Sequence, residues 1–502
     1  MRLLSFAQRF VSLFILPCLR GRWRACPAGG GITTEVLPPP SCSLTLHATS
    51  PVRCATGEDE GGVRKRVGLW PGVFVALMLA ACSPQSDRTQ ITVQRIFGEC
   101  RANVPRDQAP IRNPDGECEI LTGLIDRFQR ENPDIDLKVN IVAWPGYDQL
   151  SAQYAAGDPP DVVSIHMSSI PDYQVRGLIV PVTPYLDKAG IDAGAFTPAA
   201  RQGVMVKGAA YGLPFDNWTQ LWHINTGLFR QAGLMRGSEP ILPDSPEALL
   251  AQARQFKQAT GKPYLVQSMI NERAAYTRNL YTYLMNQQAV FFKTPKQITL
   301  NTPEARRIVG LFKQIYDEGL TTRDQDYPAA TQGFLNGQGG VYLGGTWLIG
   351  TYENEAQTQG QPLYQAYSVK PYPALFGPHQ TAYVDGHAWV VSNRTRSAAQ
   401  DAAVARFLKF LYDHDYDWSR TGHLPTVQAV ADSEAYLNLP HRRDIVSLSH
   451  TGQTLPPQVQ RQFAIQDIIG DELFSAITGH KTIEQALTDA ERRVNDLLFH
   501  LL

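Results

Sequence analysis

Tryptophan side chains, rather than a catalytic motif, are the chemically informative residues of this 502-residue chain. The sequence contains no Gly-x-Ser-x-Gly, no His-Glu-x-x-His and no Walker or dinucleotide-binding glycine pattern. Isolated carboxylate pairs leave no such pattern, so an enzyme that uses them stays an alternative. Of the eight tryptophans, six follow residue 82 and fall near predicted turns or strand ends: Trp144, Trp218, Trp222, Trp347, Trp389 and Trp418. The sequence therefore favours binding over catalysis.

One cysteine has its own chemistry because of what precedes it. The basic residues 64–66, a short apolar run over residues 67–81 and small residues before Cys82 have the order of a secretory signal peptide. About 15 apolar positions are too few to span a bilayer. Residues 79–82 (Leu-Ala-Ala-Cys) resemble the lipobox of bacterial lipoproteins, in which the cysteine is diacylated and becomes the mature N-terminus. We expect residues 63–81 to be a lipoprotein signal peptide, Cys82 to carry the lipid and residues 82–90 to be a tether.

The segment before this signal needs a separate explanation, since signal peptides begin a chain. Residues 1–62 contain four of the seven cysteines, a run of three prolines and no sustained periodicity. We interpret them as a non-native upstream extension from a mis-assigned start, with Val63 as the true first position. The alternative is a signal at residues 10–19, which would leave the second apolar segment unexplained.

Composition sets limits on the mature chain. From Cys82 onward it has 37 Lys and Arg against 43 Asp and Glu, a net charge of −6, and no basic stripe. Such a charge excludes nucleic acid as a partner. Roughly 420 residues exceed one hydrophobic core and indicate two lobes. Cys100 and Cys118 form an even pair in an oxidising compartment, which predicts a disulfide, and the absence of a nearby histidine argues against a metal site.

Strand and helix patterns alternate along the chain. Residues 91–97, 135–141 and 161–165 read as strands, and the stripes at 120–128 and 147–155 read as the helices between them. Ser245 followed by proline predicts a helix start, as does the capping box Thr482 to Gln485. Further helical stripes cover residues 305–315 and 404–411. This order predicts an α/β protein with parallel strands covered by helices.

Five segments in order carry a family resemblance. They are residues 157–163, 177–186, 211–225, 334–347 and 402–411. Together they resemble family 1 extracellular solute-binding proteins, the periplasmic components of ABC sugar importers related to maltose-binding proteins. The resemblance covers the chain from about residue 90 to its end. Each segment alone is weak evidence, but their order makes the resemblance specific.

The resemblance implies a two-lobe periplasmic binding protein fold of type II, with crossover hinge strands and an interlobe ligand cleft. One lobe is expected at 91–215 and 346–389, and the other at 217–345 and 390–502. The implied protein is a monomer without cofactor or catalytic activity. It is lipid-anchored in the periplasm and delivers a sugar to ABC permease subunits of the inner membrane.

Sugar sites combine aromatic platforms for C–H faces with a few oriented polar groups for hydroxyls. On that basis and from the resemblance, nine residues are expected to bind the ligand. Trp144 and Tyr147 follow the second strand, His166 and Ser168 follow the third, and Asp385 and His387 replace small residues of the family. The remaining three lie at the crossovers: Asn217, Trp218 and Trp347.

Other functions remain open at this level. Related folds bind glycerol phosphate, polyamines or ferric iron, and a carbohydrate-active lipoprotein enzyme is a minor alternative. A phosphate ligand would require clustered arginine or lysine at the cleft. None occurs among the crossover motifs, so the sequence favours a neutral sugar.

Overall fold

The computed structural model describes residues 88–100 and 116–501. Contacts divide the chain into two units, Met1–Ala81 and Cys82–Leu502, and the described residues belong to the second. The predicted upstream extension, the signal peptide, Cys82 and most of the tether lie outside the described residues. Among the described helices, none is long and apolar enough to cross a membrane.

A sheet of nine strands runs through the second unit, in the order β10-β13-β7-β15-β3-β1-β2, with β14 paired to β7 and β4 to β15. Its strands are β1 Thr89–Arg95, β2 Ile135–Ile141, β3 Val162–His166, β4 Ile179–Val180, β7 Leu213–Asn225, β10 Leu265–Val266, β13 Val341–Gly345, β14 Tyr367–Lys370 and β15 Val384–Ser392. Three two-stranded ribbons are separate: β5 Met205–Val206 with β6 Ala209–Ala210, β8 Met235–Arg236 with β9 Glu239–Pro240, and β11 Phe292–Thr294 with β12 Gln297–Ile298.

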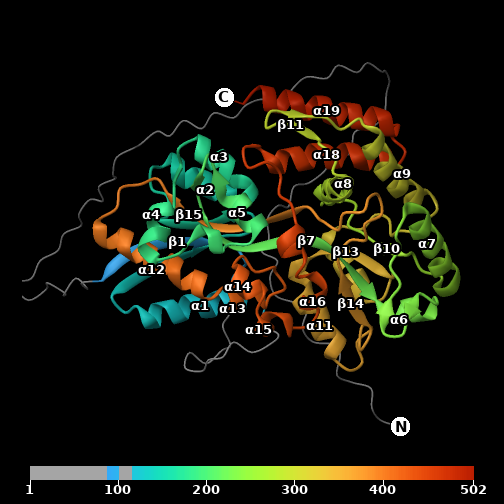
Figure 1. Ribbon diagram of the computed structural model, residues 1–502, viewed down its shortest axis with the longest axis horizontal. Helices are drawn as coiled ribbons and strands as arrows, with labels where there is room; N and C mark the ends of the chain where they lie inside the picture. The colour runs from blue at the N-terminus through green and yellow to red at the C-terminus, as the bar shows by residue number, and fades with distance from the viewer. Residues whose placement is uncertain (1–87, 101–115, 502) are drawn as a thin grey trace, which may run out of the picture. The chain divides into compact units, whose positions relative to one another are not determined.

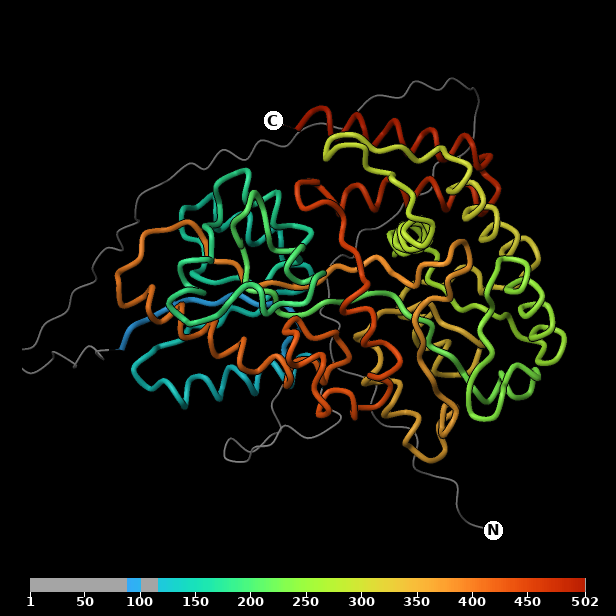
Figure 2. The backbone as a smooth tube through the Cα atoms, in the orientation of Figure 1, coloured from blue at the N-terminus to red at the C-terminus, as the bar shows by residue number. Residues whose placement is uncertain are grey.

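Strands β7 and β15 carry the chain between the two lobes. All 13 residues of β7 are buried, because its first part pairs with β15 and its second part with β13 and β14. The pairing of β15 with β7 shifts register between His387 and Ala388. Figure 2 shows the two strands passing through the middle of the described chain. Side chains on these two strands therefore belong to both lobes.

The first lobe contains β1, β2, β3, β4, most of β15 and the start of β7. Strands β1, β2 and β3 are parallel, as predicted. The helices are α1 Glu117–Glu131, α2 Tyr147–Ala155, α3 Ile170–Val175, α4 Thr183–Ala189, α5 Pro198–Val204, α12 Ala398–Asp413 and α13 Asp415–Ser419. Cys100 is joined to Cys118 with a Cα–Cα distance of 5.9 Å, which confirms the predicted disulfide.

The second lobe contains β10, β13, β14 and the end of β7. Its helices are α6 Thr226–Gln231, α7 Pro246–Thr260, α8 Ala274–Asn286, α9 Pro303–Asp317, α10 Tyr327–Leu335, α11 Ile349–Gln357, α18 Gln462–Ile477 and α19 Ile483–Phe499. Helix α18 packs against α8, α9 and α19 (Figure 1). Short elements complete the fold: α14 Gln428–Ala431, α15 Glu434–Leu437, α16 Arg442–Ile445, α17 Leu448–Thr451, and the 3₁₀ turns η1 Met167–Ser169, η2 Ala193–Ala195 and η3 Thr346–Leu348.

Two segments differ from the expected division into lobes. Helices α12 and α13, predicted for the second lobe, belong to the first: α12 packs on α4 and β1, and α13 packs on α1 and α12. Aromatic contacts hold α12 on the first lobe, because the rings of Phe407 and Phe410 lie 5.1 and 5.4 Å from the ring of Phe128 in α1. Conversely, η3, α11 and β14 were expected with the first lobe. They lie on the second, where the ring of Tyr352 is 5.1 Å from that of Phe334.

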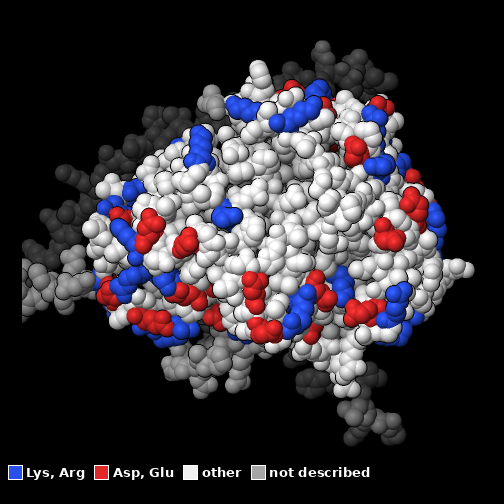
Figure 3. Space-filling model, viewed as in Figure 1, with Lys and Arg blue, Asp and Glu red and all other residues white. Residues whose placement is uncertain are grey.

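The predicted helix starts agree with the structure. The Ser245 side chain accepts from Ala248 N at the start of α7, and Thr482 and Gln485 form both hydrogen bonds of a capping box at the start of α19. These caps satisfy backbone N–H groups that a helix leaves unpaired. On the face drawn in Figure 3, acidic and basic side chains are intermixed toward the edges and the centre is largely uncharged.

Candidate functional site

A cleft of about 460 Å³ lies where both lobes meet the crossover strands. The first lobe contributes residues at the exits of β1, β2 and β3 and at the start of α1, while the second contributes α8, α10 and η3. Its lining consists of Phe97, Gly98, Glu117, Trp144, His166, Trp218, Glu272, Arg278, Tyr327, Trp347, His387 and His423. Carboxyl ends of parallel strands are where open α/β sheets place their ligands.

Two histidines lie side by side in the wall formed by the first lobe. His166 ends β3 and is opposite His387 in the antiparallel pairing of β3 with β15. The centroids of their imidazole rings are 4.5 Å apart. Both side chains are buried against the protein while facing the cleft.

Tyr147 holds the first of these histidines. Its hydroxyl lies 2.7 Å from His166 Nδ1 and also accepts from His166 N and from Ser169 Oγ, each at 3.1 Å. Burial, followed by electrostatic interactions with His387 and Arg278, lowers the pKa of His166 well below its ordinary value. His166 is therefore neutral at physiological pH.

Asp216 holds the second histidine. Both of its carboxylate oxygens lie 2.9 Å from His387 Nδ1, and it also accepts from Trp418 Nε1 at 2.9 Å and from His387 N at 3.1 Å. Burial alone would raise the pKa of Asp216. Electrostatic interactions with His387 and His423, with the hydrogen bonds from His387 and Trp418, instead lower this pKa to about 2. The carboxylate is therefore ionised behind the imidazole.

A third histidine connects the lobes at the edge of the cleft. His423 Nε2 lies 2.7 Å from Glu117 Oε1 of α1, and His423 Nδ1 lies 3.3 Å from Thr346 Oγ1 of η3. Burial lowers the pKa of His423, but the charges of Asp216 and Glu117 and the Glu117 hydrogen bond outweigh it, so the pKa is raised. A charge-assisted pair therefore ties the start of α1 to this wall.

Aromatic rings line both sides. Trp144 leaves 60% of its surface exposed, and its ring lies 4.6 Å from that of His166. Trp218 is only 4% exposed and meets Trp347 edge to face at 5.6 Å. Trp347 Nε1 donates to the Tyr327 hydroxyl at 2.8 Å. Rings with polar edges held in place suit a ligand with both C–H faces and hydroxyls.

One arginine enters the cleft from the second lobe. Arg278 of α8 pairs with Glu272 at 3.0 Å, donates to Gln466 Oε1 at 3.0 Å and lies 5.1 Å above the ring of Trp218. Its charge is therefore balanced by a neighbouring carboxylate, and Glu117 adds a second carboxylate to the same cleft.

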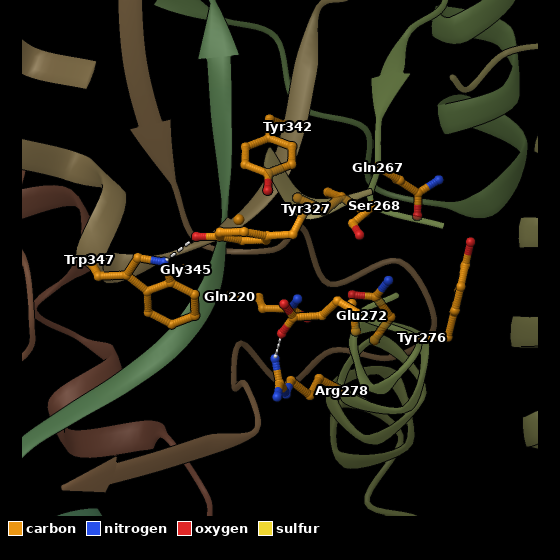
Figure 4. A pocket seen from close by; sticks show the side chains of 14 residues that line it. Gln220, Gln267, Ser268, Glu272, Tyr276, Arg278, Tyr327, Tyr342, Gly345 and Trp347 are labelled. Carbon is orange, nitrogen blue, oxygen red and sulfur yellow. Dashed lines mark hydrogen bonds and ion pairs between the residues drawn. The ribbon is translucent and has the colours of Figure 1, made fainter. Parts of the chain in front are cut away.

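A small polar chamber adjoins the cleft on the second-lobe side. It has a volume of about 20 Å³ and shares Glu272, Arg278, Tyr327 and Trp347 with the cleft (Figure 4). Three of its lining residues carry a buried polar atom that has no hydrogen-bond partner among the described residues: Gln220 Oε1, Ser268 Oγ and Tyr276 Oη. A space of this size and polarity accommodates a water molecule.

The nine predicted ligand-binding residues fall into two sets. Lining the cleft are Trp144, His166, Trp218, Trp347 and His387. The other four lie behind the lining: Tyr147 holds His166, Ser168 donates to Asp385 at 2.6 Å, and Asn217 donates to the Asp385 backbone carbonyl at 3.3 Å. Asp385 is buried and accepts from Ser168 and Gly386, so its carboxylate supports the wall.

The structure adds lining residues that the sequence analysis missed: Phe97, Glu117, Glu272, Arg278, Tyr327 and His423. Glu117 had a signal, because it precedes the disulfide cysteine Cys118. Phe97 also had a signal in the sequence, because it lies at the end of the first predicted strand. Glu272 and Arg278 had none, since they lie outside every matched motif. Within the described residues, no group of three or more His, Cys, Asp and Glu side chains is arranged to hold a metal ion.

Two α/β lobes around a cleft crossed by shared strands define the class of fold, and solved structures share it. Maltose-bound MalE3 of T. maritima matches with a TM-score of 0.66 at 18% identity, over 82% of this chain and 100% of that one. The sugar-binding protein MalE of Xanthomonas citri matches with a TM-score of 0.68 at 17% identity, over 82% and 98%. These likenesses show the predicted fold.

Sequence comparison then gives the family. The sn-glycerol-3-phosphate-binding periplasmic protein UgpB of Salmonella paratyphi A is 25% identical over 403 residues, covering 75% of this chain and 89% of that protein. Residues 123–444 match the family described as bacterial extracellular solute-binding protein. The chain belongs to this family, and it is a solute-binding protein, as predicted.

Proposed function

We propose that this protein is the ligand-binding lipoprotein of an ABC importer and that it captures a sugar in the cleft. One observation carries the proposal: Trp144, Trp218 and Trp347 meet in a single cleft beside paired imidazoles. Stacking rings with fixed polar neighbours are what a saccharide requires. Solved proteins of this fold that bind maltose agree with the assignment.

Glycerol phosphate is the second candidate, because Arg278 lies in the cleft and UgpB is named for that ligand. Against it, Arg278 is already paired with Glu272, and Glu117 lies in the same cleft. Both carboxylates are paired with the basic groups of the cleft lining, Arg278 and His423, so neither basic group is left free for a phosphate ester, which disfavours an anion. The neutral sugar therefore remains the better proposal.

A binding screen tests the assignment directly. The protein without its lipid signal, residues 83–502, is incubated with maltose, maltotriose, chitin oligosaccharides and sn-glycerol 3-phosphate, and its melting temperature and tryptophan fluorescence are recorded. A sugar should shift both signals saturably. Stabilisation by sn-glycerol 3-phosphate alone would replace the proposal with the second candidate. Cleavage of any oligosaccharide would indicate an enzyme instead.

Trp144→Ala is the sharpest variant for this test, since the ring is exposed and its loss leaves the core intact. Sugar affinity should fall by about 1–3 kcal/mol, the contribution of a large apolar contact. Phe499→Ala is the matched control, because Phe499 is 79% exposed and does not line the cleft. An unchanged affinity in the Trp144 variant would remove that residue from the site.

The same proposal includes a lipid anchor at the membrane, ABC permease subunits as partners and a monomeric state. Two acyl chains on Cys82 would hold the protein stably at the membrane, whereas a single chain binds only marginally. Metabolic labelling with palmitate should mark the full chain and not its Cys82→Ser form. Label on the Cys82→Ser form would exclude lipidation at this cysteine.

A further inference from the structure

We propose that His166 and His387 present one hydrogen-bond donor and one acceptor side by side, so that the pair selects a ligand hydroxyl over a phosphate oxygen. This inference rests on the proposed function in taking the cleft as the ligand site. In this proposal Tyr147 and Asp216 are positioning residues: Tyr147 fixes the tautomer of His166, and Asp216 fixes that of His387. The hydrogen-bond partners of the ring nitrogens determine both tautomers.

The tautomer of His166 is set by Tyr147. The Tyr147 hydroxyl accepts from His166 N and from Ser169 Oγ, so its own proton is directed to the remaining close atom, His166 Nδ1 at 2.7 Å. A hydroxyl has one proton to donate and two lone pairs to accept with. Nδ1 is therefore an acceptor, and the proton of the neutral ring lies on Nε2. The low pKa of His166 is consistent with a neutral ring.

The tautomer of His387 is set by Asp216 in the opposite sense. An ionised carboxylate only accepts, so His387 Nδ1, at 2.9 Å from both oxygens, must donate. In the neutral ring, Nε2 is then the acceptor. The two imidazoles lie in one wall with their rings 4.5 Å apart, yet their Nε2 atoms have opposite hydrogen-bonding roles.

One ring nitrogen of this pair has no hydrogen-bond partner among the described residues. His387 Nε2 is buried and has no hydrogen-bond partner within residues 88–100 and 116–501. Buried polar atoms in folded proteins are nearly always satisfied by protein, water or ligand. Because His387 lines the cleft, the ligand is in place to supply that hydrogen bond.

A hydroxyl group complements both rings, since it accepts from His166 Nε2 and donates to His387 Nε2. A phosphate dianion only accepts, and it could bind His387 only after the ring gains a proton. The ionisable groups around the pair are Tyr147, Asp216, Asp385, Arg278, His423 and Glu117. With Asp216 ionised behind His387 and Arg278 paired to Glu272, no unbalanced cation among them favours an anion.

Nitrogen-15 spectra of the ring nitrogens test the pair without any ligand. In the residue 83–502 protein at pH 7.5, His166 should show the Nε2–H pattern and His387 the Nδ1–H pattern. His166→Gln and His387→Gln spectra assign the two signals. An Nδ1–H pattern for His166, or a proton on Nε2 of His387, would overturn the proposal.

Two variants should move these signals one at a time. Tyr147→Phe removes the donor to His166 Nδ1, so the His166 signal should become a mixture of tautomers while His387 is unchanged. Asp216→Asn removes the acceptor of His387 Nδ1, so His387 should gain Nε2–H character. Asp385→Asn is the matched control, because Asp385 accepts from Ser168 rather than from an imidazole. Unchanged signals in both test variants would contradict the assigned roles, and either variant alone suffices if the other does not fold.

Binding measurements separate this inference from the proposed function. If maltose or another sugar binds, Asp216→Asn should weaken it about tenfold, which corresponds to one hydrogen bond, and should lessen the preference over inorganic phosphate. Predicted tautomers combined with tight binding of sn-glycerol 3-phosphate would overturn both the hydroxyl selectivity and the sugar assignment. Reversed tautomers combined with sugar binding would overturn the inference alone.

Discussion

The two walls of the cleft differ in how their polar groups are satisfied. In the first-lobe wall, Tyr147 and Asp216 hold the histidines through hydrogen bonds and Ser168 donates to Asp385, so that only His387 Nε2 and Asn217 Oδ1 among these groups are buried without a partner in the described residues. In the second-lobe chamber, three buried polar atoms lack partners among the described residues. A fixed wall orients its ligand contacts in advance, whereas the other retains hydrogen-bonding capacity for water or ligand. Equivalent substitutions on the two sides should therefore have unequal consequences.

The largest effect is expected for Asp385→Ala on the first-lobe side. Asp385 accepts from Ser168 Oγ at 2.6 Å, Gly386 N at 2.8 Å and Ser168 N at 3.1 Å. Its removal leaves these donors buried and unpaired, so the free energy of unfolding should fall by about 3 kcal/mol. Urea unfolding measures the change. Ser268→Ala is the control from the chamber, and an equal loss there would contradict the difference between the walls.

Tyr147→Phe should have the next largest effect. The hydroxyl takes part in hydrogen bonds with His166 Nδ1, His166 N and Ser169 Oγ. We expect a loss of about 2 kcal/mol in the free energy of unfolding, since two buried donors and one acceptor lose their partner. The measurement is again urea unfolding at neutral pH. A loss near zero would show that the wall relaxes around the missing hydroxyl.

Acid should weaken the first-lobe wall through Asp216. Its pKa in the folded protein is lowered from the ordinary 3.8 to about 2, so its ionisation stabilises the fold above pH 4. That stabilisation is lost as the pH falls through 3.8 toward 2. The stability advantage of wild type over Asp216→Asn should therefore shrink by about 1 kcal/mol between pH 7 and pH 3. Exposed Asp187→Asn serves as the control, and a pH-independent advantage would contradict the low pKa.

The smallest effect is expected for Tyr276→Phe in the chamber. This change is chemically the same as Tyr147→Phe, but the Tyr276 hydroxyl has no partner in the described part of the chain. Removing an unsatisfied buried hydroxyl should alter the free energy of unfolding by less than about 0.5 kcal/mol. Because the substitution is the same at both positions, comparing the two Tyr→Phe variants in one series measures the effect of the hydroxyl's surroundings alone. A loss as large as that of Tyr147→Phe would mean that ordered water fills the chamber.

The fold was predictable from the sequence because its evidence is local. Alternating apolar residues give β1 and β2, and Ser245 and Thr482 mark helix starts wherever the chain is placed. The lobe assignment of α12 was not predictable, since its apolar stripe suits either lobe and only the contact with Phe128 decides between them.

The candidate site was predictable only in part, for a related reason. Tryptophan near turns and strand ends pointed to Trp144, Trp218 and Trp347, but the same pattern also includes Trp222, Trp389 and Trp418, which are buried and do not line the cleft. Glu272 and Arg278 carry no local mark, and their place in the cleft depends on how α8 packs. Ser168 and Asp385, chosen as ligand contacts, are bonded to each other across 217 positions of chain. Partners so distant in sequence cannot be recognised before folding.

The disulfide between Cys100 and Cys118 has a consequence for when the cleft becomes complete. Cys118 follows Glu117, and the bond ties the start of α1 to the chain leaving β1. Glu117 in turn reaches His423 across the cleft edge. Thiols stay reduced in the cytoplasm and oxidise after export. Under the proposed export, a precursor still inside the cell would lack the covalent link that fixes this carboxylate, and the cleft would be completed only after the chain has crossed the membrane.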